Sequence, residues 1–212
     1  MLQVHIQILF GYGVKDIYTK KRAWILMDWY LHVYKRPPFG ESLNAKTWAT
    51  DVGKISYSVF RNFEILGSNN DLIAEATTKW VFLNIEDGKL DKITPELIAL
   101  YNPEGSAKEA EKKILKLKEP NTYESFCEYK VNRADIDVNK HMHNLNYLNL
   151  AYEALPEEIY NSQELNDVHI MYKHQIKLGD VVKCFYHCEG GEHTITIKSE
   201  DEKTLHAIVV LK

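Results

Sequence analysis

Short apolar runs separated by turn residues fill the second half of the chain and predict strands. These runs cover residues 168–177, 181–188, 193–199 and 204–211. Gly190-Gly191 stands between two of them, and a Gly-Gly pair is typical of a two-residue β-hairpin turn, which needs a left-handed backbone. A strand near 123–131 and a helix near 144–160 are predicted before this meander, because Leu145, Leu148, Tyr152 and Leu155 recur at helical spacing.

The first half of the chain repeats much of this order. A strand leads into a turn near Gly40 and then into a second strand that ends at Trp48. Long strands are predicted near 54–66 and 72–85, because β-branched and aromatic residues are frequent there. Each half is therefore predicted to end in an antiparallel meander, which indicates an internal duplication.

The segment between the two halves has a different composition. Residues 88–120 are rich in Lys and Glu and contain three prolines, with helical stretches near 94–101 and 106–116. We interpret this segment as an exposed linker. The predicted organisation is an N-terminal copy over 1–87, a linker over 88–120 and a C-terminal copy over 121–212.

Composition narrows the class of protein. The chain has 212 residues, 45% of them hydrophobic, and a net charge of −4, so it can bury a sizeable core in one large domain or two small ones. The charge argues against nucleic acid as the main partner, because phosphate binding relies on a basic surface. No apolar run approaches the ~20 residues of a membrane helix. The N-terminus also lacks the basic start of a signal peptide, and we expect a cytoplasmic protein.

The three cysteines fit a reducing compartment. Cys184 and Cys188 are four residues apart in one predicted strand, which separates them by ~13 Å and makes a disulfide between them impossible. Cys127 is predicted to be a buried apolar residue rather than a nucleophile. No spacing here resembles a zinc site, so no metal is expected.

Asp137, Asn139 and His141 form the most informative motif of the chain. In an extended chain alternate side chains share a face, so a carboxylate, a carboxamide and an imidazole could converge. Asn144 is the predicted N-cap of the helix that follows, and its N–H groups could bind an oxyanion. Such a layout suits acyl transfer to water. Polar residues also crowd ordinary loops that cap helices, and the spacing alone favours that structural role.

A longer stretch changes this balance. The run Arg133-Ala-Asp-Ile-Asp-Val-Asn-Lys-His-Met-His-Asn-Leu-Asn-Tyr147 resembles the signature of acyl-acyl carrier protein (acyl-ACP) thioesterases, plant and bacterial enzymes that end fatty acid synthesis. Other segments resemble the same family in the same order, namely residues 24–30, 36–41, 46–48, 74–81 and 172–180. The resemblance covers nearly the whole chain.

The resemblance implies an α+β fold, a tandem (double) hotdog. Two antiparallel sheets would each wrap around one long central helix, and the two copies would pack as a pseudo-dimer. In this family the first copy begins with a strand and a full central helix. Only 10 residues precede Gly11-Tyr12-Gly13 here, so we expect an N-terminally truncated first copy without its first strand. The chain would be either a fragment or a shortened natural variant, and we favour the fragment.

The resemblance also implies the site residues. The family's catalytic network contains an Asp, an Asn and a His, which match Asp137, Asn139 and His141. It also contains a Glu, and that position falls on Gln175, which can position water but cannot take up a proton as a carboxylate does. His141 would polarise the thioester carbonyl or relay the proton, Asp137 would orient neighbouring polar groups, and Asn139 would hold water or substrate. A Cys that some members carry after the Glu is Ile176 here, which leaves a Cys-based triad without support.

The implied activity is hydrolysis of the thioester of fatty acyl-ACP, with acyl carrier protein as partner and no metal or organic cofactor. Two alternatives stay open: a preference for acyl-coenzyme A, because both thiols end in the same phosphopantetheine arm, and an acyl-binding homologue impaired by Gln175. The basic clusters Lys20-Lys21-Arg22 and Lys35-Arg36 could meet an acidic carrier, although such runs are more often solvated surface. A homodimer would fit a hotdog fold, but the pseudo-dimer can itself suffice.

Overall fold

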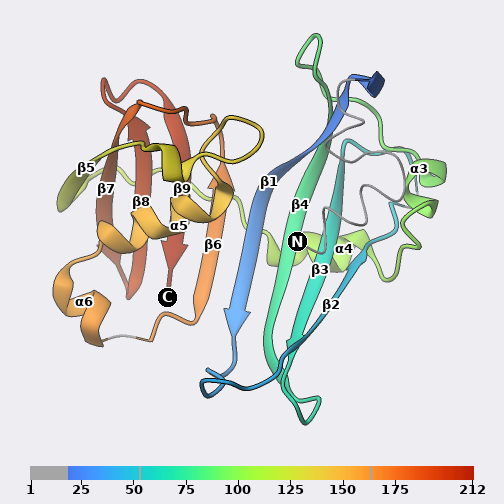
Figure 1. Ribbon diagram of the computed structural model, residues 1–212, viewed down its shortest axis with the longest axis horizontal. Helices are drawn as coiled ribbons and strands as arrows, with labels where there is room; N and C mark the ends of the chain where they lie inside the picture. Colours follow the sequence, from blue (N-terminus) through green and yellow to red (C-terminus); the bar gives the residue numbers. More distant parts are fainter. Residues whose placement is uncertain (1–18, 53, 163) are drawn as a thin grey trace. The chain divides into compact units, whose positions relative to one another are not determined.

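The computed structural model describes residues 19–212 with the exception of 53 and 163 (Figure 1). The chain divides into two compact units, Met1–Leu115 and Lys116–Lys212, and each is described on its own. The division falls within the segment 88–120. The prediction that the first copy lacks its first strand concerns residues before 19, which lie outside the described residues.

The four described strands of the first unit form an antiparallel array in the order β2-β3-β4-β1. Their bounds are β1 Arg22–Val33, β2 Asn44–Ala49, β3 Ser58–Leu66 and β4 Leu72–Asn84. The tight turn between β3 and β4 includes Asn70 at a φ of 61°, a left-handed conformation that Asn adopts more readily than most residues. The predicted strands of the first half are confirmed, with the strand predicted near 54–66 beginning at residue 58.

Two short helices lie in the segment between the halves, close to the predicted helical stretches. They are α3 Pro95–Ala99 and α4 Ala107–Lys113. The side chains of Thr94 and Ser106 each accept a backbone N–H of the first turn at 3.2 Å. Such caps satisfy N–H groups that have no partner within the helix, which explains where each helix begins.

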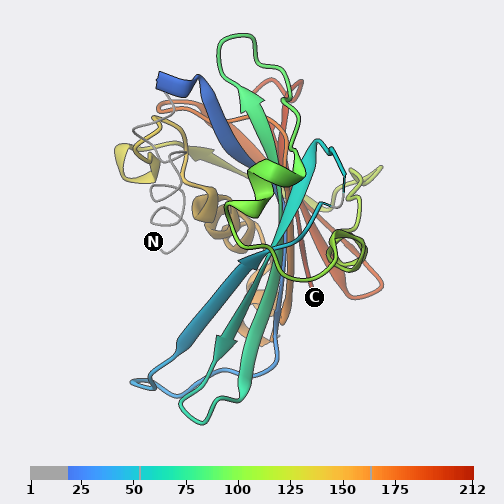
Figure 2. The ribbon, with the colours of Figure 1, turned by 90° about the vertical axis from the view of Figure 1, so that its right-hand side faces the viewer.

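This segment is not exposed throughout, and the prediction of an exposed linker is wrong on that point. Ile93 and Ile98 have exposed fractions of 0% and 1% and pack with Val59 and Phe82 of the sheet; α3 is seen over the strands in Figure 2. Burying one such side chain stabilises the fold by about 1.5–3 kcal/mol. A high Lys and Glu content therefore conceals two apolar anchors that hold the segment to the first unit.

The second unit is a five-stranded antiparallel sheet in the order β6-β9-β8-β7-β5, with one helix across its face (Figure 1). The strands are β5 Ser125–Lys130, β6 Asp167–Tyr172, β7 Val181–Glu189, β8 Glu192–Ser199 and β9 Leu205–Leu211. The helix is α5 Asn144–Glu153, and the short η1 Arg133–Asp135 and α6 Glu157–Ser162 flank it. The predicted meander is confirmed by the consecutive pairing of β7, β8 and β9.

The core of the second unit lies between α5 and this sheet. Tyr147, Leu150 and Ala151 are the buried side chains of α5, with exposed fractions of at most 4%. The sheet contributes fully buried residues, namely Ile170, Val182, Ile195, Ile197, Val209 and Leu211. Gly190 and Gly191 close the β7–β8 hairpin at φ values of 59° and 81°, as a two-residue turn of the expected kind requires.

Two predicted elements of this unit end early. The helix predicted over 144–160 stops at Glu153 and resumes as α6 after Pro156, because proline lacks an N–H and disfavours a helical conformation in the residue before it. The strand predicted over 168–177 ends at Tyr172, since the N–H groups of Lys173 and His174 both point at the carbonyl of His206, at 2.8 and 3.3 Å. The chain therefore leaves the sheet before it reaches residue 175.

No helix in the described part of the chain combines the length and the hydropathy needed to cross a membrane.

Candidate active site

The motif residues lie on a tight loop, not on an extended strand. Ile136 and Met142 form an isolated antiparallel bridge. Inside it the N–H of Asp137 donates to the carbonyl of His141 at 2.9 Å, and the N–H of Lys140 donates to the carbonyl of Asp137 at 3.0 Å. Lys140 has a φ of 65°, which reverses the chain. The expected alternation of side chains is therefore wrong, and the turn itself gathers the motif.

The carboxylate of Asp137 organises this loop. Its Oδ1 accepts the backbone N–H of Asn139 at 2.8 Å and faces that of His141 at 3.5 Å. Its Oδ2 accepts the side-chain amide of Asn139 at 3.3 Å. An Asp that holds the backbone two residues later forms an Asx turn. Asp137 thus fixes the orientation of the Asn139 amide and the course of the chain into His141, whose side chain is half-buried.

The N-cap of α5 is His143 rather than Asn144. The Nδ1 atom of His143 accepts the N–H of Leu145 at 3.2 Å, and its carbonyl accepts the N–H of Asn146 at 2.8 Å. Asn144 is instead the first residue of the helix. Sequence reasoning chose Asn144 because Asn is a more frequent cap than His. Since the N–H groups of Leu145 and Asn146 are engaged, the N–H of Asn144 becomes the candidate donor to an oxyanion at this helix terminus.

Asp135 holds the loop to its surroundings, and sequence reasoning missed it. Its Oδ2 accepts the Tyr129 hydroxyl at 2.9 Å and the Asn132 N–H at 2.7 Å. Its carbonyl accepts the N–H of His143 at 2.7 Å and the side-chain amide of Asn146 at 3.1 Å. The spacing of Asn132 and Asp135 is that of a capping box, a signal that could have found it. Through these bonds the strand β5, the loop and the start of α5 are connected.

Gln175 lies beside the loop but contacts it only through its neighbour. The carbonyl of Ile176 accepts the N–H of Met142 at 2.9 Å, and these two residues directly follow Gln175 and His141. Ile176 is fully buried, whereas Gln175 is exposed. Within the described residues no side-chain hydrogen bond joins Gln175 to the motif. The backbone therefore brings the predicted site segments together, and the Gln175 side chain stays in solvent.

His174 does not replace Gln175 at this position. Its Nδ1 lies 2.9 Å from the carbonyl of Leu205 on β9, while its backbone N–H points to His206. The alternation of side chains along a strand does not decide its direction, because β6 ends at Tyr172. The imidazole is nevertheless engaged on the β9 side by this hydrogen bond.

Tyr147 is a second residue that sequence reasoning missed. It is 3% exposed, and burial raises the pKa of its hydroxyl to about 12. The charge of Asp137 adds to this increase, and a backbone hydrogen bond with Ile176 opposes it. Its ring stands edge-on to that of Tyr172, with centroids 5.1 Å apart, and the Tyr172 hydroxyl donates to the Asn144 carbonyl at 3.0 Å. A neutral tyrosine thus lies between the loop and the Ile176 segment.

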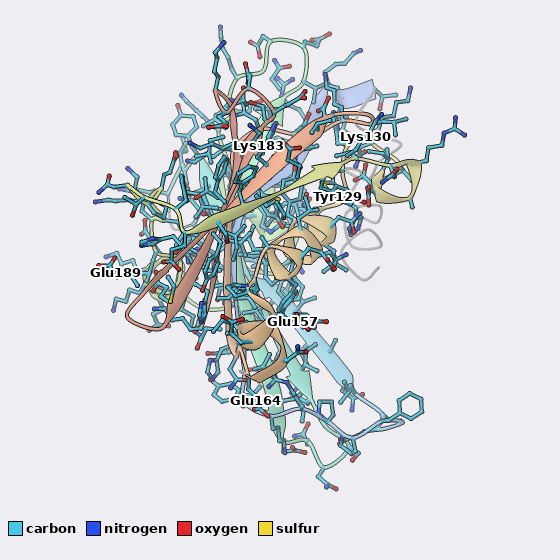
Figure 3. All side chains as sticks on the ribbon, turned by 90° about the vertical axis from the view of Figure 1, so that its left-hand side faces the viewer. Tyr129, Lys130, Glu157, Glu164, Lys183 and Glu189 are labelled. Atoms are coloured by element: carbon cyan, nitrogen blue, oxygen red, sulfur yellow. The ribbon has the colours of Figure 1, made fainter. Side chains whose placement is uncertain are left out.

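A pocket of about 350 Å³ opens beside the loop. It lies between β5 and α5, and its lining includes Cys127, Asp135, Met142, Asn146 and Glu153. Figure 3 shows this side of the second unit, where Tyr129 and Lys130 mark the end of β5. Across the described residues no group of three or more His, Cys, Asp or Glu side chains is arranged to hold a metal ion.

Both units match sequence models of one protein family. The acyl-ACP thioesterase N-terminal domain matches residues 4–101, and the acyl-ACP thioesterase C-terminal domain matches residues 118–210. The two matches follow the order of the family and together cover nearly the whole chain. The resemblance seen in the motifs is therefore confirmed.

Individual relatives agree. The chain is 29% identical to oleoyl-acyl carrier protein thioesterase 1, chloroplastic, of Arabidopsis thaliana over 171 residues, which are 75% of this chain and 46% of that protein. It is 26% identical to palmitoyl-acyl carrier protein thioesterase, chloroplastic, of Gossypium hirsutum over 173 residues, 78% of this chain and 41% of that protein. The chain thus spans about half the length of the curated relatives it matches.

Solved structures give the fold. The 12:0-ACP thioesterase from Umbellularia californica has a TM-score of 0.85 at 16% identity, covering 100% of this chain and 85% of the other. An acyl-ACP thioesterase from Bacteroides thetaiotaomicron has a TM-score of 0.77 at 16% identity, covering 97% and 82%. These likenesses confirm the expected double hotdog fold. Because the models of the family's N-terminal and C-terminal domains both match the chain, in that order, the chain belongs to the acyl-ACP thioesterase family.

Proposed function

We propose that this protein hydrolyses the thioester of fatty acyl-acyl carrier protein, which releases free fatty acid and ends fatty acid synthesis. The observation that carries the proposal is the match to both domains of the family. The loop that holds Asp137, Asn139 and His141 against the first turn of α5 supports it, since these groups are suited to acyl transfer to water.

Each site residue has a role in this proposal. The thioester carbonyl would face the N–H of Asn144, where the positive end of the helix dipole stabilises a developing negative charge. His141 would polarise that carbonyl or take the proton of the attacking water. Asn139, oriented by Asp137, would hold the water or the substrate. No metal or organic cofactor enters the scheme.

Gln175 distinguishes this chain from the family pattern. A carboxamide accepts a hydrogen bond from water but does not take up its proton, so the general base in this proposal is His141. The exposed position of Gln175 favours one alternative, a homologue that binds acyl chains and turns them over slowly. Preference for acyl-coenzyme A over the carrier protein is the other alternative, because the two share the same thiol arm.

We propose that the protein is cytoplasmic and that its partner is acyl carrier protein. It would bind neither nucleic acid nor membrane. A homodimer is compatible with the fold. The plant relatives are named as chloroplastic proteins. Of the basic clusters that could meet an acidic carrier, one has Arg22 paired with Asp91 and the other has Lys35 paired with Asp71. These internal ion pairs leave less positive charge for the carrier than the sequence alone suggests.

The test is release of free thiol from medium- and long-chain acyl-acyl carrier protein and acyl-coenzyme A. His141→Ala is expected to lower the rate by ~10²- to 10⁴-fold, the usual value of general-base help. His174→Ala is the matched control, because this nearby imidazole bonds to Leu205, and it should retain the rate. Faster release from the carrier protein than from coenzyme A supports the assigned substrate.

Three outcomes decide against parts of this proposal. Undiminished hydrolysis in His141→Ala would remove His141 from the mechanism. An inactive natural chain that gains hydrolysis with Gln175→Glu would identify an impaired enzyme on an intact scaffold, while tight acyl binding without turnover in both proteins would identify an acyl-binding homologue.

A further inference from the structure

Two cysteines face each other across neighbouring strands of the second unit. Cys127 on β5 is the register partner of Cys184 on β7, and both are free thiols. Directly opposite residues of antiparallel strands have Cα atoms about 4.5–5.5 Å apart, within the range of about 4.4–6.8 Å that a disulfide spans. The pair that can form a disulfide is therefore not Cys184 and Cys188, which share one strand.

The two thiols differ in environment. Cys184 is fully buried, whereas Cys127 is half-buried, so the prediction of a buried Cys127 is wrong. A hydrogen bond from Cys184 is the main reason that the pKa of Cys127 is lowered, to about 7, and the same contact together with burial raises the pKa of Cys184. Because the thiolate is the reacting form of cysteine, Cys127 is the group that attacks the reagent first. Cys184 is the group that reacts in the second step.

The pocket beside the motif loop gives reagents access to Cys127. Its lining includes this thiol together with the carboxylates of Glu128, Asp135 and Glu153. Such a set of acidic side chains attracts cations and repels anions. Among the described strands, β5 is also the last of its sheet and pairs only with β7, so it can shift slightly as a bond forms.

We propose that Cys127 and Cys184 are a redox-active dithiol that small disulfides, cationic ones in preference, oxidise to an intramolecular disulfide through the pocket between β5 and α5. In the first step the Cys127 thiolate attacks one sulfur of the reagent, which forms a mixed disulfide and releases one thiolate. Cys184 then gives up its proton and attacks the sulfur of Cys127, which forms the internal bond and releases the second thiol. Two protein thiols are oxidised while one disulfide is reduced to two thiols.

The internal bond would join β5 covalently to β7. β5 carries Tyr129, whose hydroxyl holds Asp135 and, through it, the start of the motif loop. Oxidation would therefore act on the strand that supports the loop. The proposal concerns protein thiols alone, and it stands whether or not the chain hydrolyses thioesters.

The experiment treats the full chain at pH 7.5 with cystamine, which is cationic, hydroxyethyl disulfide, which is neutral, or glutathione disulfide, which is anionic. Thiol titration is expected to show loss of two of the three thiols, and peptide mapping by mass spectrometry should find Cys127 joined to Cys184 with Cys188 free. Cystamine should react several-fold faster than glutathione disulfide, with the difference shrinking at high salt. A dithiol reductant should restore all three thiols.

Single variants separate the two steps. Cys184→Ser should keep half of the reagent as a stable mixed disulfide on Cys127. Cys127→Ser should form neither this mixed disulfide nor the internal disulfide. Cys188→Ser should behave like the natural chain. Three thiols that persist after treatment, or a disulfide that includes Cys188, would overturn the proposal. The peptide map of the natural chain decides the matter even if a variant fails to fold.

Discussion

Asp137 shows how one carboxylate can serve both the loop and the chemistry. Its hydrogen bonds to Asn139 and to the backbone of His141 are those of an ordinary Asx turn. The same bonds, however, fix the amide of Asn139 and the backbone of His141, whose side chain is half-buried. The structural reading of the motif and the catalytic one are therefore compatible, and measured activity has to separate them.

Two buried histidines make the second unit sensitive to acid. His169 on β6 and His193 on β8 are 6% and 1% exposed. Burial lowers the pKa of His169 to about 4, with the charge of Glu192 opposing this effect, and burial also lowers the pKa of His193. An exposed histidine in the unfolded chain has a pKa of about 6.5.

The sign of the pH effect follows from these values. Between pH ~6.5 and ~4 the unfolded chain binds a proton on residue 169 that the folded chain does not bind. The contribution of His169 is therefore complete above pH ~6.5, and about 3 kcal/mol is lost as the pH falls to ~4. Urea unfolding at pH 7.0 and at 4.5 should show a smaller acid loss in His169→Gln than in the natural chain. The exposed His174→Gln should match the natural chain, and equal losses in all three proteins would contradict this account.

At the level of elements, the predictable features are those set by neighbours in sequence. The β7–β8–β9 meander follows from short apolar runs and from Gly190-Gly191, whose positive φ values are confirmed. The break at Pro156 is also local, and its consequence for the long helix could have been drawn from the sequence. The end of β6 at Tyr172 depends on the carbonyl of His206, which no local pattern around residues 173–177 contains.

The site divides in the same way. Asp137, Asn139 and His141 stand within five positions and could be chosen from sequence and family resemblance. Asp135 and Tyr147 escaped notice because their roles depend on contacts with Tyr129 and Ile176. The pair of Cys127 and Cys184 depends on the register of β5 against β7. Such contacts join residues that are far apart in the sequence. They are set by the folded sheet, so composition and spacing do not reveal them.

The cap of α5 provides a test at the level of one element. His143→Ala removes the acceptor of the Leu145 N–H and is expected to lower the free energy of unfolding by about 0.5–2 kcal/mol. His143→Asn keeps an acceptor of the kind that helix caps prefer and should restore most of that loss. Urea unfolding of the three proteins measures both effects. If Asn restores stability but not hydrolysis, the imidazole of His143 takes part in the chemistry and is more than a cap.

At the scale of the whole molecule, the second unit supplies its own sheet and its own helix. All five strands of its antiparallel array, from β6 through β9, β8 and β7 to β5, come from residues 116–212, and so does α5. The motif loop is likewise held by residues of this unit, through Asp135 and Ile176. A compact unit with its own core can in principle fold alone.

We therefore expect residues 116–212, produced alone, to fold with a β-rich circular dichroism spectrum and one cooperative thermal transition. The same fragment with Ile197→Asp is the matched control, because a charge at this fully buried position should abolish the transition. A natural fragment that lacks a cooperative transition, like the control, would show that the second copy depends on residues 1–115 for its fold. In that case the family's two-domain arrangement would be a requirement for stability as well as for the proposed activity.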